Sequence, residues 1–160
     1  MVLKLLALAL TALILIPSGA HLFELPGKFG LDRDAYFNVQ GIYAGWAWFS
    51  VPIFAAILAN GVLFFAERRR DPTAARAALL SAGLIALSLV VFFIWVFPAN
   101  QATANWTEMA DKWEVLRQSW EYGHAANAFI VFAALIGTAR AIIGTGGETR
   151  LVAIDGRAEL

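Results

Sequence analysis

Four long apolar segments dominate the chain and are separated by short stretches rich in charged and polar residues. The segments cover residues 2–23, 41–66, 73–97 and 125–143. Each approaches or exceeds the roughly 20 residues that an α-helix needs to cross the hydrocarbon core of a bilayer. Because no water is present there to satisfy backbone groups, helices are the expected structure. The pattern predicts an all-α fold, a transmembrane four-helix bundle that runs up, down, up and down.

Local sequence signals predict the ends of the third helix. Asp71 followed by Pro72 is typical of an N-cap and a first helical turn, because proline lacks the backbone N–H that is unpaired there anyway. Pro98, directly after Phe97, indicates the end of the same helix. The third span is therefore expected between these two prolines.

Two further helical stretches are predicted at the polar ends of the spans. Asp32 or Asp34 can cap a long second helix, which Pro52 is expected to kink. Residues 106–120 carry tryptophans at a seven-residue spacing, which keeps one helical face: Trp106, Trp113 and Trp120. This stretch is expected to be an interfacial helix that runs into the fourth span, with its tryptophans as membrane anchors.

Composition points to the same class of protein. Hydrophobic residues make up 60% of the 160 residues and charged residues 15%, and the mean hydropathy is +0.67, whereas soluble proteins average about 25% charged residues. Twelve basic residues balance twelve acidic ones, so no nucleic-acid partner is indicated. The absence of cysteine excludes disulfides, zinc–thiolate sites and cysteine nucleophiles. We expect a membrane domain over residues 1–144 and a Gly-rich, flexible cytoplasmic tail over residues 145–160.

The first apolar segment has a second interpretation. Lys4 is followed by an apolar run over residues 5–16 and by small residues up to Ala20, a pattern that is also typical of a secretory signal peptide. Cleavage there would leave His21 as a new amino terminus, where the amine and the imidazole together could chelate a metal ion. A retained transmembrane helix is the preferred interpretation, and cleavage is the alternative.

The distribution of basic residues predicts the orientation of the bundle. With four spans, one end carries eight basic residues: Lys4, Arg68, Arg69, Arg70, Arg76, Arg140, Arg150 and Arg157. The other end carries four: Lys28, Arg33, Lys112 and Arg117. Because loops rich in basic residues stay on the cytoplasmic side, both termini are expected in the cytoplasm, in a multi-pass protein of the bacterial inner membrane.

Both histidines of the chain lie three positions from a glutamate, at helix ends that share one side of the membrane. His21 precedes Glu24 at the end of the first span, and Glu121 precedes His124 at the start of the fourth. Residues three apart share a helix face, so each pair can direct one imidazole and one carboxylate the same way. Ionisable groups in membrane helices are costly and usually functional. The two pairs are therefore expected to converge at one depth.

Further polar residues fall at the same predicted level. Gln40 and Tyr43 continue a stripe from Tyr36 at the start of the second helix, and Asn127 lies one turn below His124. The exit of the third helix adds three amides: Asn100, Gln101 and Asn105. Together these side chains predict a polar pocket under an aromatic lid. Its expected substrate-binding residues are Gln40, Tyr43, Asn127 and Trp120.

Three chemistries fit such a pocket. Two imidazoles and a carboxylate can hold one copper, iron or zinc ion, and the expected ligands are His21, Glu24, Glu121 and His124. Alternatively, a histidine held by its glutamate is a general base for an acidic carbon or phenol, and an amide stabilises the oxyanion. The expected catalytic residues are then His124, Glu121, His21 and Asn100. As a third alternative, both histidines are axial ligands of a haem in an electron-transfer protein.

A structural role competes with all three chemistries. Histidine and glutamate at helix ends can simply be hydrated or paired, and Glu-x-x-His alone is a weak motif. Three polar residues inside the spans, Asn60, Ser81 and Ser88, are assigned to helix packing. The alternative from a different class is therefore a non-catalytic membrane subunit or helper protein, whose polar cluster only fixes the register of the helices.

The order of the motifs resembles a known family. A family of small four-helix membrane proteins, to which the anthrone oxygenases belong, is similar to this chain over about residues 16–137, in the succession GAHLFELPGKFGL, YFNVQGIYAGWAWF, FPANQATANW and WEVLRQSWEYGHAANA. Pro98-Ala99-Asn100 matches the family's Pro-x-Asn after the third helix, and Trp120 with His124 matches its tryptophan and histidine at the start of the fourth. The run GHAAN lacks the arginine of the oxygenase branch, and HLFELP is typical of an uncharacterised branch.

The resemblance implies oxidation of an activated aromatic carbon by O2 without flavin or haem, with histidine, asparagine and tryptophan involved. The leading hypothesis is a membrane oxygenase or related oxidoreductase that acts on a hydrophobic aromatic or quinone-like molecule. Its expected partners are the lipid bilayer and this small molecule, and a homo-oligomer stays open.

Overall fold

Helices make up almost all of the described chain. The computed structural model describes residues 1–143, and the expected tail over residues 145–160 lies outside them. The long helices are α1 (Val2–Phe29), α3 (Ser50–Glu67), α4 (Pro72–Val91) and α6 (Trp113–Ile143). Shorter helical segments are α2 (Arg33–Gln40), η1 (Gly41–Tyr43), η2 (Trp46–Phe49), η3 (Phe92–Val96) and α5 (Phe97–Ala102). Residues 1–143 contain no strand, so the all-α prediction is confirmed.

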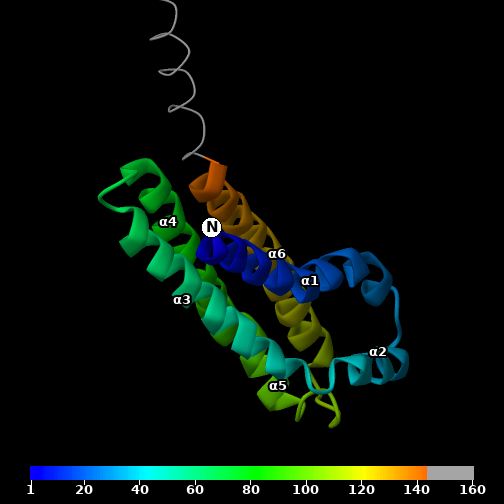
Figure 1. Cartoon of the computed structure of the whole chain (residues 1–160). Helices are drawn as coiled ribbons and strands as arrows, with labels where there is room; N and C mark the ends of the chain where they lie inside the picture. Colours follow the sequence, from blue (N-terminus) through cyan, green and yellow to red (C-terminus); the bar gives the residue numbers. More distant parts are fainter. Residues whose placement is uncertain (144–160) are drawn as a thin grey trace, which may run out of the picture.

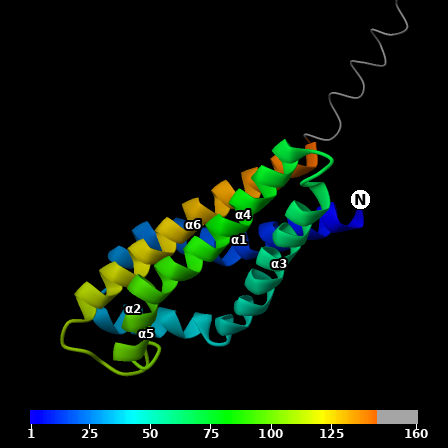
Figure 2. The ribbon, with the colours of Figure 1, turned by 90° about the vertical axis from the view of Figure 1, so that its left-hand side faces the viewer.

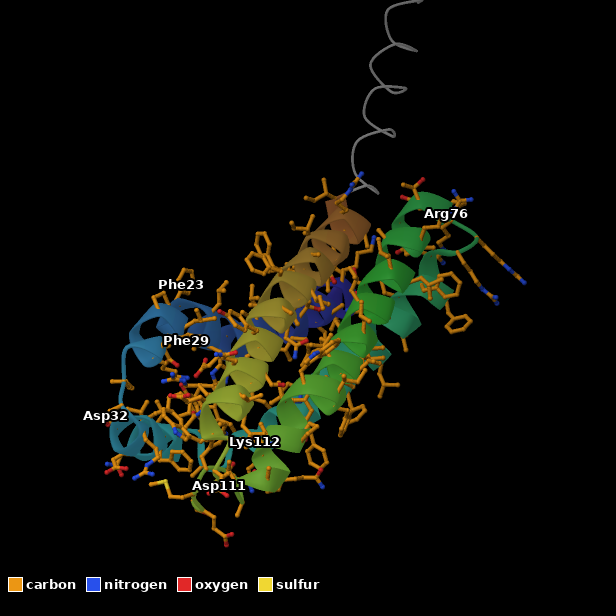
Figure 3. All side chains as sticks on the ribbon, turned by 180° about the vertical axis from the view of Figure 1, so that it is seen from behind. Phe23, Phe29, Asp32, Arg76, Asp111 and Lys112 are labelled. Atoms are coloured by element: carbon orange, nitrogen blue, oxygen red, sulfur yellow. The ribbon has the colours of Figure 1, made fainter. Side chains whose placement is uncertain are left out.

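The four long helices pack as a bundle in which each runs antiparallel to the next (Figure 1, Figure 2). α1 and α4 each pack against both α3 and α6, so the order around the bundle is α1, α3, α4, α6. The amino terminus, the α3–α4 turn and the end of α6 lie at one end, and α2 and α5 lie at the other. Figure 3 shows Arg76 at the first end and Asp32, Asp111 and Lys112 at the second. The expected up-down-up-down arrangement is present.

The outer surface of the bundle is apolar. Within residues 1–143, the stretches long and apolar enough to cross a membrane are Val2–Phe29, Trp46–Glu67, Pro72–Ala102 and Trp113–Ile143. Large apolar side chains point outward from them, and Leu58, Phe65 and Phe129 are each more than half exposed. Helices that are apolar all round are stable in lipid rather than in water. In length and composition the chain is therefore a multi-pass integral membrane protein.

α1 is longer than predicted. It ends at Phe29 rather than at residue 23, although two prolines lie inside it. The added turns lie apart from α3 and α4, and Figure 3 shows Phe23 at the predicted end of the helix and Phe29 at its observed end. Arg117 of α6 accounts for this extension, because its guanidinium donates to the backbone carbonyls of Leu31 (3.0 Å) and Lys28 (3.5 Å) and so satisfies acceptors at the helix end.

The prediction of one long, kinked second helix is wrong. The chain instead forms α2, two short 3-10 turns and then α3. Asp32 does cap α2, since its carboxylate accepts a hydrogen bond from the backbone N–H of Ala35 (2.9 Å). Gly45 then breaks the chain direction with a φ of +84°, a left-handed conformation that favours glycine. Pro52 lies in the first turn of α3, where it interrupts no continuous helix.

The third span continues past its predicted end. α4 passes into the π-helical turn η3 and then into α5, with Pro98 in the first turn of α5. The hydroxyl of Ser119 on α6 donates to the carbonyl of Trp95 (2.8 Å) and ties the π-helical turn to α6. Single π-helical turns often occur at functional sites, and this one lies at the same end of the bundle as both histidines.

The predicted interfacial helix over residues 106–120 is wrong in its first half. Residues 104–106 have φ values of 45°, 57° and 66°, and helical structure resumes only at Trp113. The backbone N–H of Trp106 donates to the hydroxyl of Thr103 (2.9 Å), which holds this turn. The Trp106 ring is 5% exposed. It is therefore part of the interior at this end of the bundle and not a membrane anchor.

A buried polar cluster joins three helices in the interior of the bundle, toward the end that carries the amino terminus. The amide of Asn60 donates to the hydroxyl of Thr11 (3.2 Å) and accepts from the hydroxyl of Thr138 (2.9 Å). All three side chains are fully buried. Such hydrogen bonds between apolar helices fix their register, so the assignment of Asn60 to packing is confirmed. Ser81 and Ser88 bond to carbonyls of their own helix.

Candidate functional site

The two histidines of the chain lie ring on ring. His21 comes from α1 and His124 from α6, and their ring centroids are 4.0 Å apart with an interplanar angle of 29°. The two helices pack along each other, and their antiparallel directions bring the end of α1 beside the start of α6. The expected convergence of the two imidazoles at one depth is therefore present in the structure.

Aromatic rings enclose the histidine pair. The ring centroid of His21 lies 4.6 Å from that of Tyr43, 5.4 Å from that of Trp46 and 4.8 Å from that of Trp120. Trp120 also contacts His124, at 4.3 Å. His21 is 3% exposed, and its Nδ1 has no hydrogen-bond partner among the described residues. The expected aromatic lid is thus a set of rings in direct contact with the imidazoles.

The carboxylates of the two motifs meet at a lysine. The ammonium of Lys28 lies 3.2 Å from a carboxylate oxygen of Glu24 and 3.5 Å from one of Glu121. Its Nζ also lies 4.3 Å from the ring centroid of Tyr43 and 4.9 Å from that of Trp120, a geometry typical of cation–π contacts. Lys28 is 3% exposed and Glu121 is fully buried. The two acidic residues are therefore ion-paired with Lys28 and do not contact the histidines as a mixed ligand set.

Two tyrosines complete this ionic cluster. The hydroxyl of Tyr36 donates to Glu121 Oε1 (2.9 Å) and accepts from Gln40 Nε2 (2.6 Å). The hydroxyl of Tyr43 donates to Glu24. Burial raises the pKa of the Tyr36 phenol far above its usual value, and the negative charge of Glu121 raises it further. Burial and the hydrogen bond to Glu24 do the same for the pKa of Tyr43, so both phenols stay protonated donors.

Sequence reasoning missed two residues of this site. Lys28 is predicted only as one of four basic residues at this end of the bundle, although its spacing from Glu24 and His21 places all three on one face of a helix. Arg117 was counted with it, yet it is 9% exposed and lies over the ring of Trp113 (4.6 Å). The sequence alone does not place Lys28 or Arg117 in the site, because both contacts depend on the extension of α1 to Phe29.

Apart from Gln40, the predicted amides divide into three groups. Asn100 Oδ1 accepts hydrogen bonds from the indole N–H groups of both Trp120 (2.9 Å) and Trp106 (3.2 Å), so it positions the ring that contacts both histidines. Asn127 is 6% exposed and its Oδ1 has no partner among the described residues. The other two, Gln101 and Asn105, are exposed and lie outside the site.

A metal ion does not fit the predicted ligands as they lie. In residues 1–143 no three His, Asp or Glu side chains are placed to hold one. Imidazole lone pairs lie in the ring plane, so two stacked rings do not direct them at one shared ion. Haem ligands must approach the iron from opposite faces through their nitrogen tips, whereas His21 and His124 face each other at 4.0 Å. Binding of a metal ion or of a haem by both histidines would therefore require one imidazole ring to rotate.

A groove lies elsewhere on α6, at the same height as the histidines. It has a volume of about 530 Å³ and is lined mainly by Val91, Trp95, Ser119, Tyr122, Gly123 and Ala126. At about 100° per residue these α6 positions point away from the face that carries His124. The groove holds no acidic, basic or histidine side chain, so the candidate chemistry lies on the other face of α6.

Comparison with protein-family models, with curated proteins and with solved structures finds no match to this chain.

Proposed function

We propose that the protein is a membrane oxidoreductase of the oxygenase type, which acts on a hydrophobic aromatic or quinone-like molecule. The observation that carries the proposal is the stacked pair of the buried His21 and the partly buried His124 among aromatic rings, with Nδ1 of His21 free of any hydrogen bond to the described residues. A flat aromatic molecule is the ligand class that such rings recognise, because offset and edge contacts between rings are favourable. The motif resemblance to the anthrone-oxygenase family supports the same substrate class.

The proposed role of the histidine pair is general base catalysis. A free imidazole nitrogen takes a proton from an activated aromatic CH2 group, and the carbanion that remains gives electrons to O2. A C–O bond forms, the second proton leaves, and the O–O bond breaks, so that CH2 and O2 become C=O and water. The negative charge of the Glu24 carboxylate favours the positive charge that develops on the His21 ring. Asn100 acts as a positioning residue, through Trp120.

Oxygen uptake by the purified protein tests the proposal. The wild type, His21→Ala and His124→Ala are compared in detergent with anthrone as the substrate, and Trp48→Ala, whose ring is 78% exposed, is the control. Loss of a general base lowers the rate by about 10²–10⁴-fold, so we expect both histidine variants to lose at least 100-fold and the control to keep its rate. Equal rates in all four proteins would refute the proposal.

The same preparations test the metal and haem alternatives. Elemental analysis of the wild type beside the His21→Ala, His124→Ala double variant detects bound copper, iron or zinc. A Soret absorption band in the wild type would show bound haem. A metal present in the wild type and absent from the double variant would replace the base mechanism with one in which a ring turns to bind the ion.

A second candidate is a non-catalytic subunit or helper protein. The observation that favours it is the pairing of both motif carboxylates with Lys28 and with Tyr36 or Tyr43, because these bonds join α1, α2, η1 and α6. If the histidine variants lose stability and the wild type neither consumes oxygen nor carries a metal, this candidate replaces the oxygenase.

The structure also bears on membrane orientation. Because Lys28 and Arg117 are buried, the exposed basic residues at the histidine end reduce to Arg33 and Lys112. The opposite end keeps Arg68, Arg69, Arg70 and Arg76 exposed. Applied to these exposed charges, the positive-inside rule supports cytoplasmic termini, with the histidine site on the outer side of the bacterial inner membrane.

A further inference from the structure

We propose that Glu121 and Gln40 form a subsite for a hydroxyl group. The subsite makes the protein take the hydroxyl-bearing, reduced form of an aromatic ligand in preference to the corresponding carbonyl form. The proposal rests on the proposed function for the aromatic class of the ligand, and it adds the redox state in which that ligand binds.

The subsite is built around the hydroxyl of Tyr36. That hydroxyl donates its proton to Glu121 Oε1 (2.9 Å) and accepts from Gln40 Nε2 (2.6 Å). One oxygen remains on each neighbour, Glu121 Oε2 and Gln40 Oε1, and neither has a hydrogen-bond partner among the described residues. Glu121 is fully buried and Gln40 is 3% exposed. Two unpaired acceptors therefore flank one phenol in the interior.

Unpaired buried acceptors point to a missing donor. More than about 90% of buried polar groups in proteins have a hydrogen-bond partner, and here the Tyr36 proton is already committed to Glu121. A ligand hydroxyl can donate to Glu121 Oε2 or to Gln40 Oε1, and a bond to a carboxylate is charge-assisted. A ligand carbonyl offers only a further acceptor and leaves both oxygens unpaired.

The surroundings of the subsite suit an aromatic ligand. Tyr36 contacts the ring of Trp106, with centroids 5.1 Å apart, and that of Trp113, at 6.1 Å. Glu121 lies one helical turn before His124 on α6, so the subsite and the histidine share one face of this helix. Beyond His124, the Oδ1 of Asn127 is a third buried acceptor without a partner in the described chain.

Water is the other source of the same hydrogen-bond donor, and a matched ligand pair separates the two. Tetramethyl-1,4-hydroquinone and tetramethyl-1,4-benzoquinone have nearly the same shape and differ in hydroxyl against carbonyl groups. Sites built to bind a hydroxyl can reject an analogue that lacks it by roughly 10⁴-fold. A buried water can donate to the same acceptors when the benzoquinone is bound, which reduces this selectivity. We therefore expect the hydroquinone to bind at least 10-fold more tightly than the benzoquinone.

Titration calorimetry under nitrogen measures both ligands on the full-length protein in detergent. Gln40→Leu removes one of the two acceptors and leaves Glu121 Oε2, so it is expected to lower the ratio of the two dissociation constants without abolishing the preference. Asn38→Leu removes an exposed amide from the same helix and is expected to keep the wild-type ratio. If Gln40→Leu does not fold, Gln40→Met replaces it, because methionine is closer in shape to glutamine. The ratio measured for the wild type tests the subsite without any variant.

Two outcomes overturn the proposal. Equal affinities, or tighter binding of the benzoquinone to the wild type, would show that the free oxygens do not select a donor. Binding of neither ligand would assign the two acceptors to water alone. Because nitrogen prevents turnover, these results are independent of the oxygen-uptake assay: a 10-fold preference without oxygen uptake keeps the subsite and rejects the oxygenase.

Discussion

His21 and His124 stack with their ring centroids 4.0 Å apart and join the first membrane helix to the last. The contact lies where α1 leaves the bundle, so the two rings hold the end of α1 against α6. Trp120 contacts both of them, at 4.8 Å and 4.3 Å. The pair is consequently a structural link as well as the centre of the candidate site, and its two roles can be measured separately.

The energetic coupling of the two rings can be measured by a double-mutant cycle. Stacked aromatic pairs contribute about 0.5–1.5 kcal/mol beyond their burial, so the His21→Ala and His124→Ala effects on the free energy of unfolding are expected to be non-additive by that amount. Reversible unfolding in mixed micelles measures all four proteins. A cycle between His124→Ala and Trp48→Ala, with the exposed Trp48 ring, is the control and should be additive. Additive histidine effects would mean that the rings do not interact in solution.

Lys28 is expected to be essential for stability. Lys28→Met leaves Glu24 and the fully buried Glu121 without their shared cation. Removal of one partner from a buried ion pair costs about 3–5 kcal/mol, and we expect a loss of that size in the free energy of unfolding. Lys112→Met, at an exposed position on the same end, is the control and should change it by less than about 0.5 kcal/mol. Equal stability of the two variants would show that the cluster around Lys28 does not persist in the protein.

Gly137 on α6 packs tightly against Ser81 of α4. A Cβ atom there would lie 2.4 Å from the hydroxyl oxygen of Ser81. Gly137→Ala is therefore expected to lower the free energy of unfolding by about 1–3 kcal/mol through overpacking. Gly83→Ala on α4, where a Cβ meets nothing within 4 Å, is the matched control and should be neutral or slightly stabilising.

A variant of Ser81, the residue that a Cβ atom at position 137 would meet, provides a stricter test of this prediction. Because the clash is with a hydroxyl oxygen, Ser81→Ala in the Gly137→Ala background is expected to restore most of the lost stability. Failure of the double variant to recover, with Ser81→Ala alone near wild type, would place the close contact elsewhere along α4.

The arrangement of the spans follows from the sequence, whereas the ends of the helices do not. Long apolar segments and alternating directions suffice to predict the bundle, and they bring residues 21 and 124 to one level. The end of α1 depends on Arg117, which donates to the carbonyl of Leu31 from a distant part of the chain. The turn at Trp106 depends on the hydroxyl of Thr103. Hydrophobic periodicity and capping signals do not predict either of these two hydrogen bonds.

The same dependence explains why the site was only half predicted. The motif spacing indicated two imidazole–carboxylate pairs that face one centre. The structure separates them into an imidazole stack and an ionic cluster, because Lys28 lies on the added turns of α1 and attracts both carboxylates. Sequence patterns assign a basic residue just beyond a predicted helix end to a loop. They miss a helix that is extended by tertiary contacts.

The buried Tyr36 and the partly buried Tyr43 predict how stability changes with pH. In the folded protein the pKa values of Tyr36 and Tyr43 are raised above the usual value, which is about 10 in an unfolded chain. Above that pH the unfolded state loses protons that the folded state keeps, so the free energy of unfolding falls as pH rises. Unfolding measured from pH 8 to 11 should show this slope, and the Tyr36→Phe, Tyr43→Phe double variant should show a smaller one. An unchanged slope would contradict the raised pKa values of the two phenols.

Asn100 is expected to control the position of Trp120. Its Oδ1 is the acceptor for two indole N–H groups, those of Trp120 (2.9 Å) and Trp106 (3.2 Å). Asn100→Leu leaves both donors unpaired, and a buried donor without a partner costs about 1–3 kcal/mol, so we expect a loss of that order and a shift in tryptophan fluorescence. Asn100→Asp keeps the acceptor and should preserve the emission.

The neighbouring amide provides the control for this variant. Gln101→Leu removes an exposed amide from the same turn of α5 and is expected to leave both stability and emission near wild type. Because Trp120 contacts both imidazoles, Asn100→Leu should also weaken the coupling measured between His21 and His124. A variant that shifts the emission and keeps the full histidine coupling would show that the stack is held without Trp120, and Asn100 would then be a purely local hydrogen-bond acceptor.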